Sequence, residues 1–525
     1  MKKIFLSLVA CAGLFTSCDM DTTQYGVVED TTELDFNFVT QNRNYSVYSC
    51  LRGMTVGAWV YSEELQLDQF IGLSTNGARG MNMADGSINS ATSEPTAMFQ
   101  SCYAKIAQVN FTLEKIAILM ESGNVSEDEM AELKRYMAEC KFARAYYYFF
   151  LYDHFCATYT DAIGDAPAMG LQLVTVYAPS SDTSSYPGRS TQNETLELIN
   201  KDLTDAFDGL AEYEANISRD NIGAGASYLS SYAVAALQAR VALVTSQFAT
   251  AIDKADYVIG NSNYRLAEGE DYIAMWSDEN TSELIFAPYY DSKEISSPTG
   301  VSTSIGWNYW WPGNTAQCDY IPTQETVLSL FEYVDADGYA DDARFYAFLN
   351  NSPIQVEGGT VKGYIFYKYP GNPALNPGST NYYINTPKPF RLSEQYLIKA
   401  EAAAMSGKSD IAKSAIETLV TARLFDPDNS APDFNLSASD LLAFIRNERS
   451  KELLGEGFRL SDLRRWKQGF NRNQPYDLDA TIAQTRSVVA LNVVYSADDY
   501  RYVWPIPYEE MNINPQLKGQ QNPGY

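Results

Sequence analysis

The chain contains one histidine, His154, and this limits the chemistry open to it. A zinc-binding HExxH motif needs two histidines, and a Ser-His-Asp or Cys-His arrangement would have to use this one. His154 stands at the end of a strongly aromatic segment, in Tyr152-Asp153-His154-Phe155. We therefore expect it to pack as a structural residue, which disfavours triad hydrolases and histidine-based metal enzymes.

Neither the cysteines nor the acidic loops form a recognisable metal site. Five cysteines follow the first eighteen residues, and their wide spacing fits neither a disulfide framework nor a CxxC site. We expect most of them to be small buried side chains. The alternative, in an oxidising compartment, is that two of them form one disulfide. The five are Cys50, Cys102, Cys140, Cys156 and Cys318.

Asp335 to Asp342 resembles a calcium loop only superficially. Its sixth position would be Ala340 in place of glycine, and its twelfth would be Tyr346 in place of glutamate. We expect no metal and no other cofactor.

Acidic and basic residues alternate densely in the C-terminal part of the chain. Two carboxylates at a set distance could cleave a glycosidic bond, but an arginine stands near almost every acid. Because buried charges need partners, we expect an ion network that joins helices, and no enzyme activity. The residues are Arg391, Glu394, Glu401, Glu448, Arg449, Glu452, Glu456, Arg459, Asp462 and Arg465.

Residues 304–314 are the strongest candidate for ligand binding. This segment holds three of the seven tryptophans within five residues, and its Gly, Pro and Asn residues indicate a loop. Exposed rings can stack on sugar rings while Asn side chains bond hydroxyl groups; buried rings would instead pack the loop on the scaffold. The candidates are Trp307, Asn308, Tyr309, Trp310 and Trp311.

A second candidate is the polar, glycine-rich segment 74–82. Asn76, Arg79 and Asn82 could contact a ligand there, and the alternative is an exposed connector. The net charge of −28 disfavours nucleic acid as a partner. An apolar content of 45% and an aromatic content of 13% support a large core.

The first eighteen residues resemble a bacterial lipoprotein signal. Lys2 and Lys3 precede an uncharged run of twelve residues, which is shorter than the roughly 20 needed to span a bilayer but fits a secretory signal. The run ends in Leu14-Phe15-Thr16-Ser17-Cys18, which resembles a lipobox; an ordinary cleaved signal is the alternative. We expect residues 1–17 to be removed, and Cys18 to carry the lipid that tethers the protein to a membrane.

Helical periodicity dominates the rest of the chain. Ser126 and Glu129 form a capping-box pattern, and Ser437 with Asp440 indicates another cap. The expected helices are Ala104–Glu121, one from Ser126 to about Tyr152, Asn193–Tyr213, Ala226–Ala249, Ala251–Ile259, Leu392–Met405, Ser409–Leu424 and Leu441–Leu454.

The sequence predicts a mostly α fold, with tetratricopeptide-like helix pairs as scaffold, long irregular loop insertions and a few short strands. The strand-like runs are Glu283–Tyr290 and Tyr364–Tyr369, and Gly53–Pro95 and Asp161–Ser190 look loop-rich. We expect a tether over 18–45 and one unit over 46–525. That unit has scaffold helices at about 96–260 and 390–470, a loop-rich insertion at about 261–389 and a tail at about 471–525.

Several motifs, in order, resemble the SusD/RagB family from the lipobox to the last residue. Residues 390–402 are similar to its R-x-x-E-x-Y-L-x-x-A-E-A signature, and residues 448–466 to its ER-x-x-EL and EG-x-R-x-x-DL-x-RW block. Tyr502-Val503-Trp504-Pro505-Ile506-Pro507, the final Gln521-Asn522-Pro523-Gly524-Tyr525 and the helix start Tyr103–Asn110 also fit. The chain departs from the pattern at Phe155-Cys156, where many members continue with Phe-Gly and a proline.

This resemblance implies a surface-exposed lipoprotein, anchored to the cell outer membrane through Cys18, that captures an oligosaccharide or polysaccharide. Its partner would be a SusC-like TonB-dependent outer-membrane transporter. A RagB-like peptide binder is the first alternative, and a surface glycan-degrading enzyme is a distant second.

Overall fold

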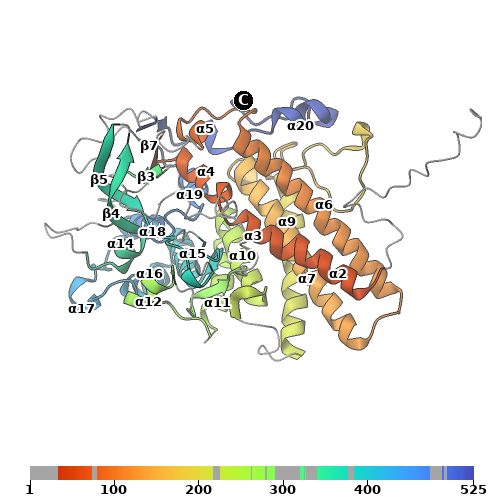
Figure 1. Ribbon diagram of the computed structural model, residues 1–525, viewed down its shortest axis with the longest axis horizontal. Coiled ribbons are helices and arrows are strands. Elements are labelled where there is room, and N and C mark those ends of the chain that lie inside the picture. The colour runs from red at the N-terminus through yellow and green to blue at the C-terminus, as the bar shows by residue number, and fades with distance from the viewer. Residues whose placement is uncertain are drawn as a thin grey trace, which may run out of the picture.

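The computed structural model describes residues 34–73, 80–216, 225–261, 263–277, 281–289, 318, 320–323, 326, 331, 340–356, 358–375, 384–472, 488–489 and 493–525. The expected fold class is confirmed: the described chain is mostly helical, with a few short strands (Figure 1). Within these ranges, no helix is both long enough and apolar enough to cross a membrane.

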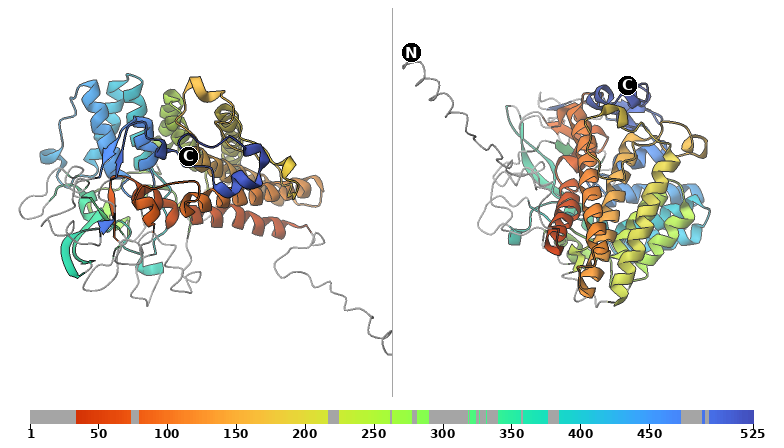
Figure 2. Two further views of the ribbon diagram at one scale, coloured as in Figure 1. Left: turned by 90° about the horizontal axis from the view of Figure 1, so that it is seen from above. Right: turned by 90° about the vertical axis from the view of Figure 1, so that its right-hand side faces the viewer.

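The scaffold consists of long helices, most of which pack against the next long helix in the chain, while α11 packs against the distant α15. Contacts join α6 to α7, α7 to α9, α10 to α11, α11 to α15 and α15 to α16. Figure 2 (right) shows them side by side, from orange through yellow and green to cyan. Their bounds are α6 Ser93–Glu121, α7 Glu127–Phe155, α9 Gln192–Asn216, α10 Ser231–Val244, α11 Phe248–Ile259, α15 Leu392–Met405, α16 Ser409–Thr421 and α18 Ala438–Glu452.

Local sequence signals explain where these helices begin and how closely they pack. The capping box predicted at the start of α7 is confirmed, with Ser126 and Glu129 bonding each other's backbone N–H groups. The cap predicted at Ser437 is confirmed as well. A Cβ at Gly209 would lie 2.9 Å from the Cβ of Ala138, so the absence of a side chain lets α9 approach α7.

The segment Gly53–Pro95 was expected to be loop-rich, and this was wrong in part. It contains α4 (Ala58–Gln66), β1 (Phe70–Leu73), α5 (Met81–Ala84) and the start of α6. Helix α4 buries polar side chains such as Glu63 and Glu64 beside Leu65, so its sequence has no apolar stripe of helical period. Before it come α2 (Phe36–Arg43), a π-helix (Asn44–Ser49) and α3 (Cys50–Met54).

The strands form small antiparallel sheets beside the helices. β1 lies between β3 (Tyr320–Pro322) and β8 (Val488–Val489). The expected run Glu283–Tyr290 contains a strand, whereas Tyr364–Tyr369 overlaps only the end of one that begins at Gly359. The other pairs are β2 (Leu284–Phe286) with β6 (Phe390–Arg391), β4 (Leu349–Val356) with β5 (Gly359–Phe366), and β7 (Phe470–Asn471) with β9 (Val494–Tyr495). The shorter helices are α8 (Asp161–Gly164), α12 (Gly269–Ala274), α14 (Ala343–Phe348), α17 (Pro427–Ser430), α19 (Arg459–Trp466) and α20 (Tyr508–Ile513).

The aromatic end of α7 is the centre of the core. The hydroxyls of Tyr147, Tyr148 and Tyr152 donate to Ser46 O, Val174 O and Gln192 Oε1, at 2.7, 3.0 and 3.0 Å. Large apolar rings are therefore buried without leaving their polar ends unbonded. All five described cysteines are buried, as expected for small core residues.

The C-terminal motif holds the chain end against the end of α7. Asn522 Nδ2 donates to Phe155 O at 2.8 Å and to Trp504 O at 2.7 Å, and Gln521 exchanges two hydrogen bonds with the backbone of Ile506. Figure 1 accordingly places the C-terminus near the upper end of α6.

Five charged residues from distant parts of the chain meet in the interior, and we call them the buried ion cluster. Glu452, at the end of α18, lies 2.9 Å from Arg391 in β6, 3.0 Å from Arg423 after α16 and 3.4 Å from Arg344 in α14. Glu283, just before β2, lies 3.0 Å from Arg391 and 2.9 Å from Arg423. All five side chains are at most 1% exposed.

The other charged residues of the predicted network are also ion-paired. Glu456 pairs with Arg391, Glu394 with Arg240 on α10, Glu401 and Asp462 with Arg465, and Arg459 with Asp68. Arg449 also pairs with Asp462, and Glu448 with Arg344. The expectation that these residues form a paired network joining helices is confirmed.

The cluster keeps the carboxylate of Glu452 charged despite its burial. Burial alone would raise the pKa of Glu452, but Arg423, Arg391 and Arg344 more than offset it, and its pKa lies well below the usual 4.5. The ionised carboxylate therefore stabilises the fold above about pH 4.5, and this stabilisation is lost as the pH falls through its lower folded pKa.

Replacing Glu452 with Gln should destabilise the protein strongly, because three buried guanidinium groups lose their shared counter-charge. Breaking a buried pair in this way costs about 3–5 kcal/mol. Urea denaturation measures the loss in unfolding free energy. Glu114→Gln is the matched control, since the Glu114–Lys115 pair is partly exposed and such pairs contribute about 0–1 kcal/mol. Equal losses in both variants would contradict a special role for the cluster.

Candidate functional site

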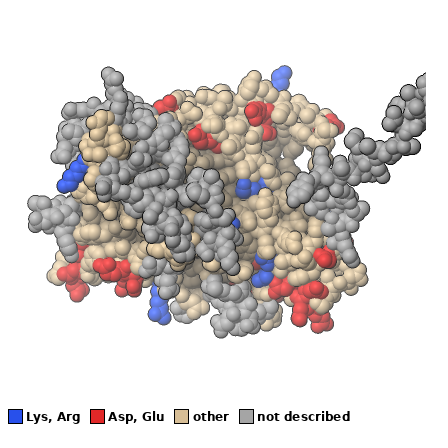
Figure 3. All heavy atoms as spheres, in the orientation of Figure 1, with Lys and Arg blue, Asp and Glu red and all other residues tan. Residues whose placement is uncertain are grey.

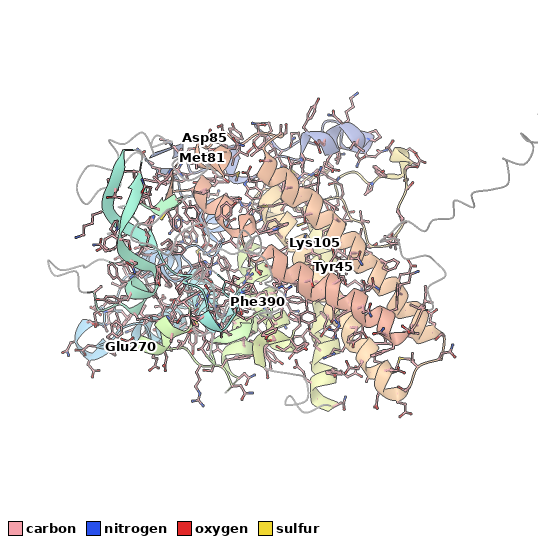
Figure 4. All side chains as sticks on the ribbon, in the orientation of Figure 1. Tyr45, Met81, Asp85, Lys105, Glu270 and Phe390 are labelled. Carbon is pink, nitrogen blue, oxygen red and sulfur yellow. The ribbon has the colours of Figure 1, made fainter. Side chains whose placement is uncertain are left out.

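Most of the ligand-binding residues predicted from the sequence lie outside the described residues. This holds for Trp307, Asn308, Tyr309, Trp310 and Trp311, for Asn76 and Arg79, and for the lipidation candidate Cys18. Asn82 is described and exposed on α5. Figure 4 labels Met81 and Asp85, on either side of it, near the top of the molecule.

His154 is buried in the core, as expected. Its Nδ1 donates to Phe150 O at 2.9 Å, and its Nε2 lies 2.9 Å from Glu63 Oε2. The imidazole stacks on the ring of Phe150, with centroids 4.1 Å apart, and lies 4.6 Å from the ring of Trp504. Both ring nitrogens are therefore engaged by the protein.

A cavity of about 100 Å³ lies beside His154, and we call it the aromatic cavity. The helices α4, α7 and α10 contribute to its walls, together with the segments before β6 and before α19. The rings of Trp59 and Phe150 meet edge to face in its wall, 5.0 Å apart. The aromatic lining is Trp59, Tyr146, Phe149, Phe150, Tyr369 and Phe458.

The acidic groups that line the aromatic cavity are paired with the protein itself. Asp153 lies 2.6 Å from Arg464, and Glu456 lies 2.6 Å from Arg391.

The cationic groups in the lining are engaged in the same way. Arg240 lies 2.6 Å from Glu394, and Lys388 donates to the carbonyl of Thr386 at 2.9 Å. Arg240 is thus ion-paired, whereas Lys388 bonds a neutral carbonyl. A ligand in the cavity would meet aromatic faces and hydrogen-bonding groups, and the charges of Asp153, Glu456 and Arg240 are already balanced by the protein, which suits a neutral molecule with hydroxyl groups.

The size of the cavity sets its capacity. It has room for about three water molecules at roughly 30 Å³ each. It can therefore seat the edge of one ring, and an extended chain would have to continue over the surrounding surface. One such neighbour is Lys105, whose ammonium lies 5.1 Å from the centre of the Trp59 ring; Figure 4 shows Lys105 beside Tyr45, which is 59% exposed.

Sequence reasoning did not find this cavity. Two signals pointed toward it: a tryptophan, Trp59, in the stretch taken as loop-rich, and the aromatic run at the end of α7. Neither signal indicates that these segments meet Arg240 and Phe458, which lie far along the chain.

Two adjacent carboxyls on α4 are buried close to the aromatic cavity. Burial raises the pKa of Glu63, and it raises the pKa of Glu64 to about 8, with a further contribution from the Glu63 charge. Glu64 Oε1 accepts a hydrogen bond of 2.9 Å from the N–H of Gly457, a cavity residue. The protonation of Glu64 is thus coupled to the packing of α4 against the segment before α19.

Comparisons with known families match two parts of the chain. Residues 339–525 match a family model described as the SusD family. Residues 59–243 match a model described as starch-binding, associating with the outer membrane. A comparison with curated protein sequences finds no match.

Solved structures share the fold over nearly the whole chain. A SusD superfamily protein from Bacteroides thetaiotaomicron is 24% identical with a TM-score of 0.72, covering 93% of this chain and 99% of its own. A SusD-like carbohydrate-binding protein from Bacteroides vulgatus is 18% identical with a TM-score of 0.67, covering 93% and 98%. A laminarin-binding SusD-like protein is 20% identical with a TM-score of 0.66, covering 93% and 99%.

The raised pKa of Glu64 predicts that stability falls as the pH rises. Its folded pKa of about 8 exceeds the ordinary 4.5, so its contribution is complete below pH 4.5 and is lost as the pH rises through 8. Glu64→Gln keeps the acceptor for Gly457 but cannot ionise. We expect this variant to melt above wild type at pH 8.5, and the difference between its melting temperatures at pH 5 and pH 8.5 to shrink.

The matched control is Glu197→Gln, at an exposed position on α9. It should keep the wild-type difference between the two pH values. If Glu64→Gln also kept that difference, Glu64 would not be the buried acid inferred from the structure.

Proposed function

The chain belongs to the SusD/RagB family, and we propose that it captures an oligosaccharide or polysaccharide at the cell surface and delivers it to a SusC-like TonB-dependent transporter in the outer membrane. In this proposal it is anchored through a lipid on Cys18, lies outside the membrane and has no catalytic activity. Residues 1–17 act as its signal and 18–45 as its tether, before a single unit over 46–525.

The observation that carries the ligand class is that most charged groups lining the aromatic cavity are already ion-paired. Asp153, Glu456 and Arg240 each pair with another residue of the protein, so a charged ligand would gain little from them while losing its own hydration. A neutral sugar would place the apolar edge of one ring against Trp59 and Phe150, and hydroxyl groups against the polar lining. The laminarin-binding relative supports the same class.

Surface charge also argues against acidic glycans. The chain carries 66 acidic against 38 basic residues, and Figure 3 shows acidic side chains gathered at both lower corners of the described surface. An acidic polysaccharide would be repelled. The same acidic clusters favour basic peptides, so peptide capture of the RagB kind is the second candidate.

Transfer to a transporter explains why a binder without an import pathway of its own would be useful. A protein held over the mouth of a barrel raises the local concentration of its ligand there, which increases uptake without any additional contact.

The number of acyl chains on Cys18 determines how firmly the protein is anchored. Two acyl chains on one cysteine would anchor it stably, whereas one would not.

Replacing tryptophans should locate the primary glycan site. Affinity gels containing laminarin, starch, inulin or mannan would be run with wild type and with Trp307→Ala, Trp310→Ala, Trp311→Ala and Trp59→Ala. We expect at least one glycan to retard wild type, and at least one variant to lose most of that retardation, since losing a stacked ring costs about 0.5–1.5 kcal/mol beyond its buried area.

The control for this experiment is Tyr508→Ala, because Tyr508 is 59% exposed on α20, outside the lining of the aromatic cavity. It should run like wild type. Normal retardation of all four tryptophan variants would exclude these rings from binding. Binding of a basic peptide digest alone would overturn the ligand class.

Removing the lipidation site should release the protein from the membrane. Cys18→Ala should appear in the soluble periplasmic fraction, because no acyl chain can be attached. Wild type should fractionate with the outer membrane and, after detergent extraction and affinity purification, bring a TonB-dependent barrel with it. Outer-membrane fractionation of Cys18→Ala would contradict the anchor, and repeated purification of wild type without a barrel would contradict the partnership.

A further inference from the structure

A second, larger depression lies on the helical scaffold, and we call it the helical groove. Its volume is about 910 Å³, and it runs between α15, α16 and residues 264–269, which lead into α12. It shares no lining residue with the aromatic cavity. Figure 4 marks Glu270, next to the groove residue Gly269, at the lower left, apart from the central Lys105 and Tyr45.

The lining of the helical groove combines rings with hydrogen-bonding groups. Tyr396 on α15 and Phe425 after α16 are both half-buried. Ser414, Thr418 and Thr421 are exposed along one face of α16, spaced by four and three residues. The rim adds the exposed carboxylates Glu268 and Glu417 and the guanidinium of Arg265.

The walls of this groove are fixed by the buried ion cluster. The N–H of Ala267 donates to Glu283 Oε2 at 2.8 Å, and its carbonyl accepts from Arg423 at 2.5 Å. Gly269 has a φ of +48°, and a Cβ there would lie 3.6 Å from the Phe425 ring. The loop therefore stays in place beside α16 without a ligand, so little ordering cost attends binding.

The groups available in the groove favour a glycan over a peptide. An extended peptide is commonly held by backbone hydrogen bonds along an open strand edge. Here the backbone groups of α15 and α16 are bonded within their helices, and the groove offers side-chain hydroxyls, carboxylates and one guanidinium. Such groups bond the many hydroxyls of a neutral sugar, while Tyr396 and Phe425 can pack on its ring faces.

We propose that the helical groove is a second carbohydrate-binding site, for a neutral oligosaccharide segment. The inference rests on the proposed function, because it takes glycan to be the ligand class. Two sites on one chain can hold separate parts of one polysaccharide, and the second contact then becomes intramolecular. Long chains should consequently bind more tightly than short ones.

The test uses two groove variants, one that removes a ring from the groove and one that adds a large side chain to it. Tyr396→Ala removes a ring, and Thr418→Arg fills the groove from an exposed position on α16, where arginine is a good helix former. Both would be run on affinity gels containing laminarin, starch, inulin or mannan, beside wild type, Trp59→Ala and Tyr508→Ala. Circular dichroism would check that each variant is folded.

The expected result is that both groove variants lose about tenfold or more of the affinity of wild type for the long glycan, within the range that a linked second site supplies. Tyr508→Ala should match wild type. Unchanged retardation of folded Thr418→Arg, with loss in a tryptophan variant, would overturn the groove and leave the proposed function standing. Failure of all four glycans to retard wild type would overturn both, and loss of basic-peptide binding in the groove variants would overturn the glycan assignment.

Discussion

The structure depends on one buried electrostatic constraint, the shared neutralisation of Glu452 and Glu283 by Arg391, Arg423 and Arg344. These charges come from α14, α18, β6 and the ends of β2 and α16, and they have no access to water. Desolvation makes such a cluster a weak source of net stability, but an incomplete cluster is very unfavourable. It therefore requires one arrangement of the segments that carry it, and this is the arrangement that the rest of the fold follows.

Both candidate binding surfaces are continuous with that cluster. Glu456 lines the aromatic cavity and bonds Arg391. The backbone of Ala267 bonds Glu283 and Arg423, and its neighbours Leu266 and Glu268 line the helical groove. Each surface is held by interactions inside the protein. Ligand binding then adds ring stacking and hydroxyl contacts to a site that is already formed, which favours neutral sugars and modest affinities.

The parts of the fold set by local sequence could be predicted, and the parts set by distant pairing could not. The cap at Ser126 and the bounds of α15 follow from periodicity and local hydrogen bonds. Helix α4 was missed because tertiary contacts bury its glutamates, and propensity alone gives no sign of this. The network was predicted around Arg391 and Glu452, but its other members Glu283, Arg344 and Arg423 were not, because only the folded chain brings them there. The aromatic cavity escaped prediction for the same reason, because Trp59 and Phe458 meet only in three dimensions.

The central claim is that this protein holds a neutral glycan, and calorimetric titration at two salt concentrations tests it most directly. Wild type would be titrated with laminarin, starch, inulin and mannan, and separately with a basic peptide digest. We expect saturable binding of a glycan with a Kd between micromolar and millimolar, which corresponds to a binding free energy of roughly 8 to 4 kcal/mol. That affinity should be the same at low and high salt, because a neutral ligand is not screened. Binding of peptides alone, weakening as salt rises, would contradict it.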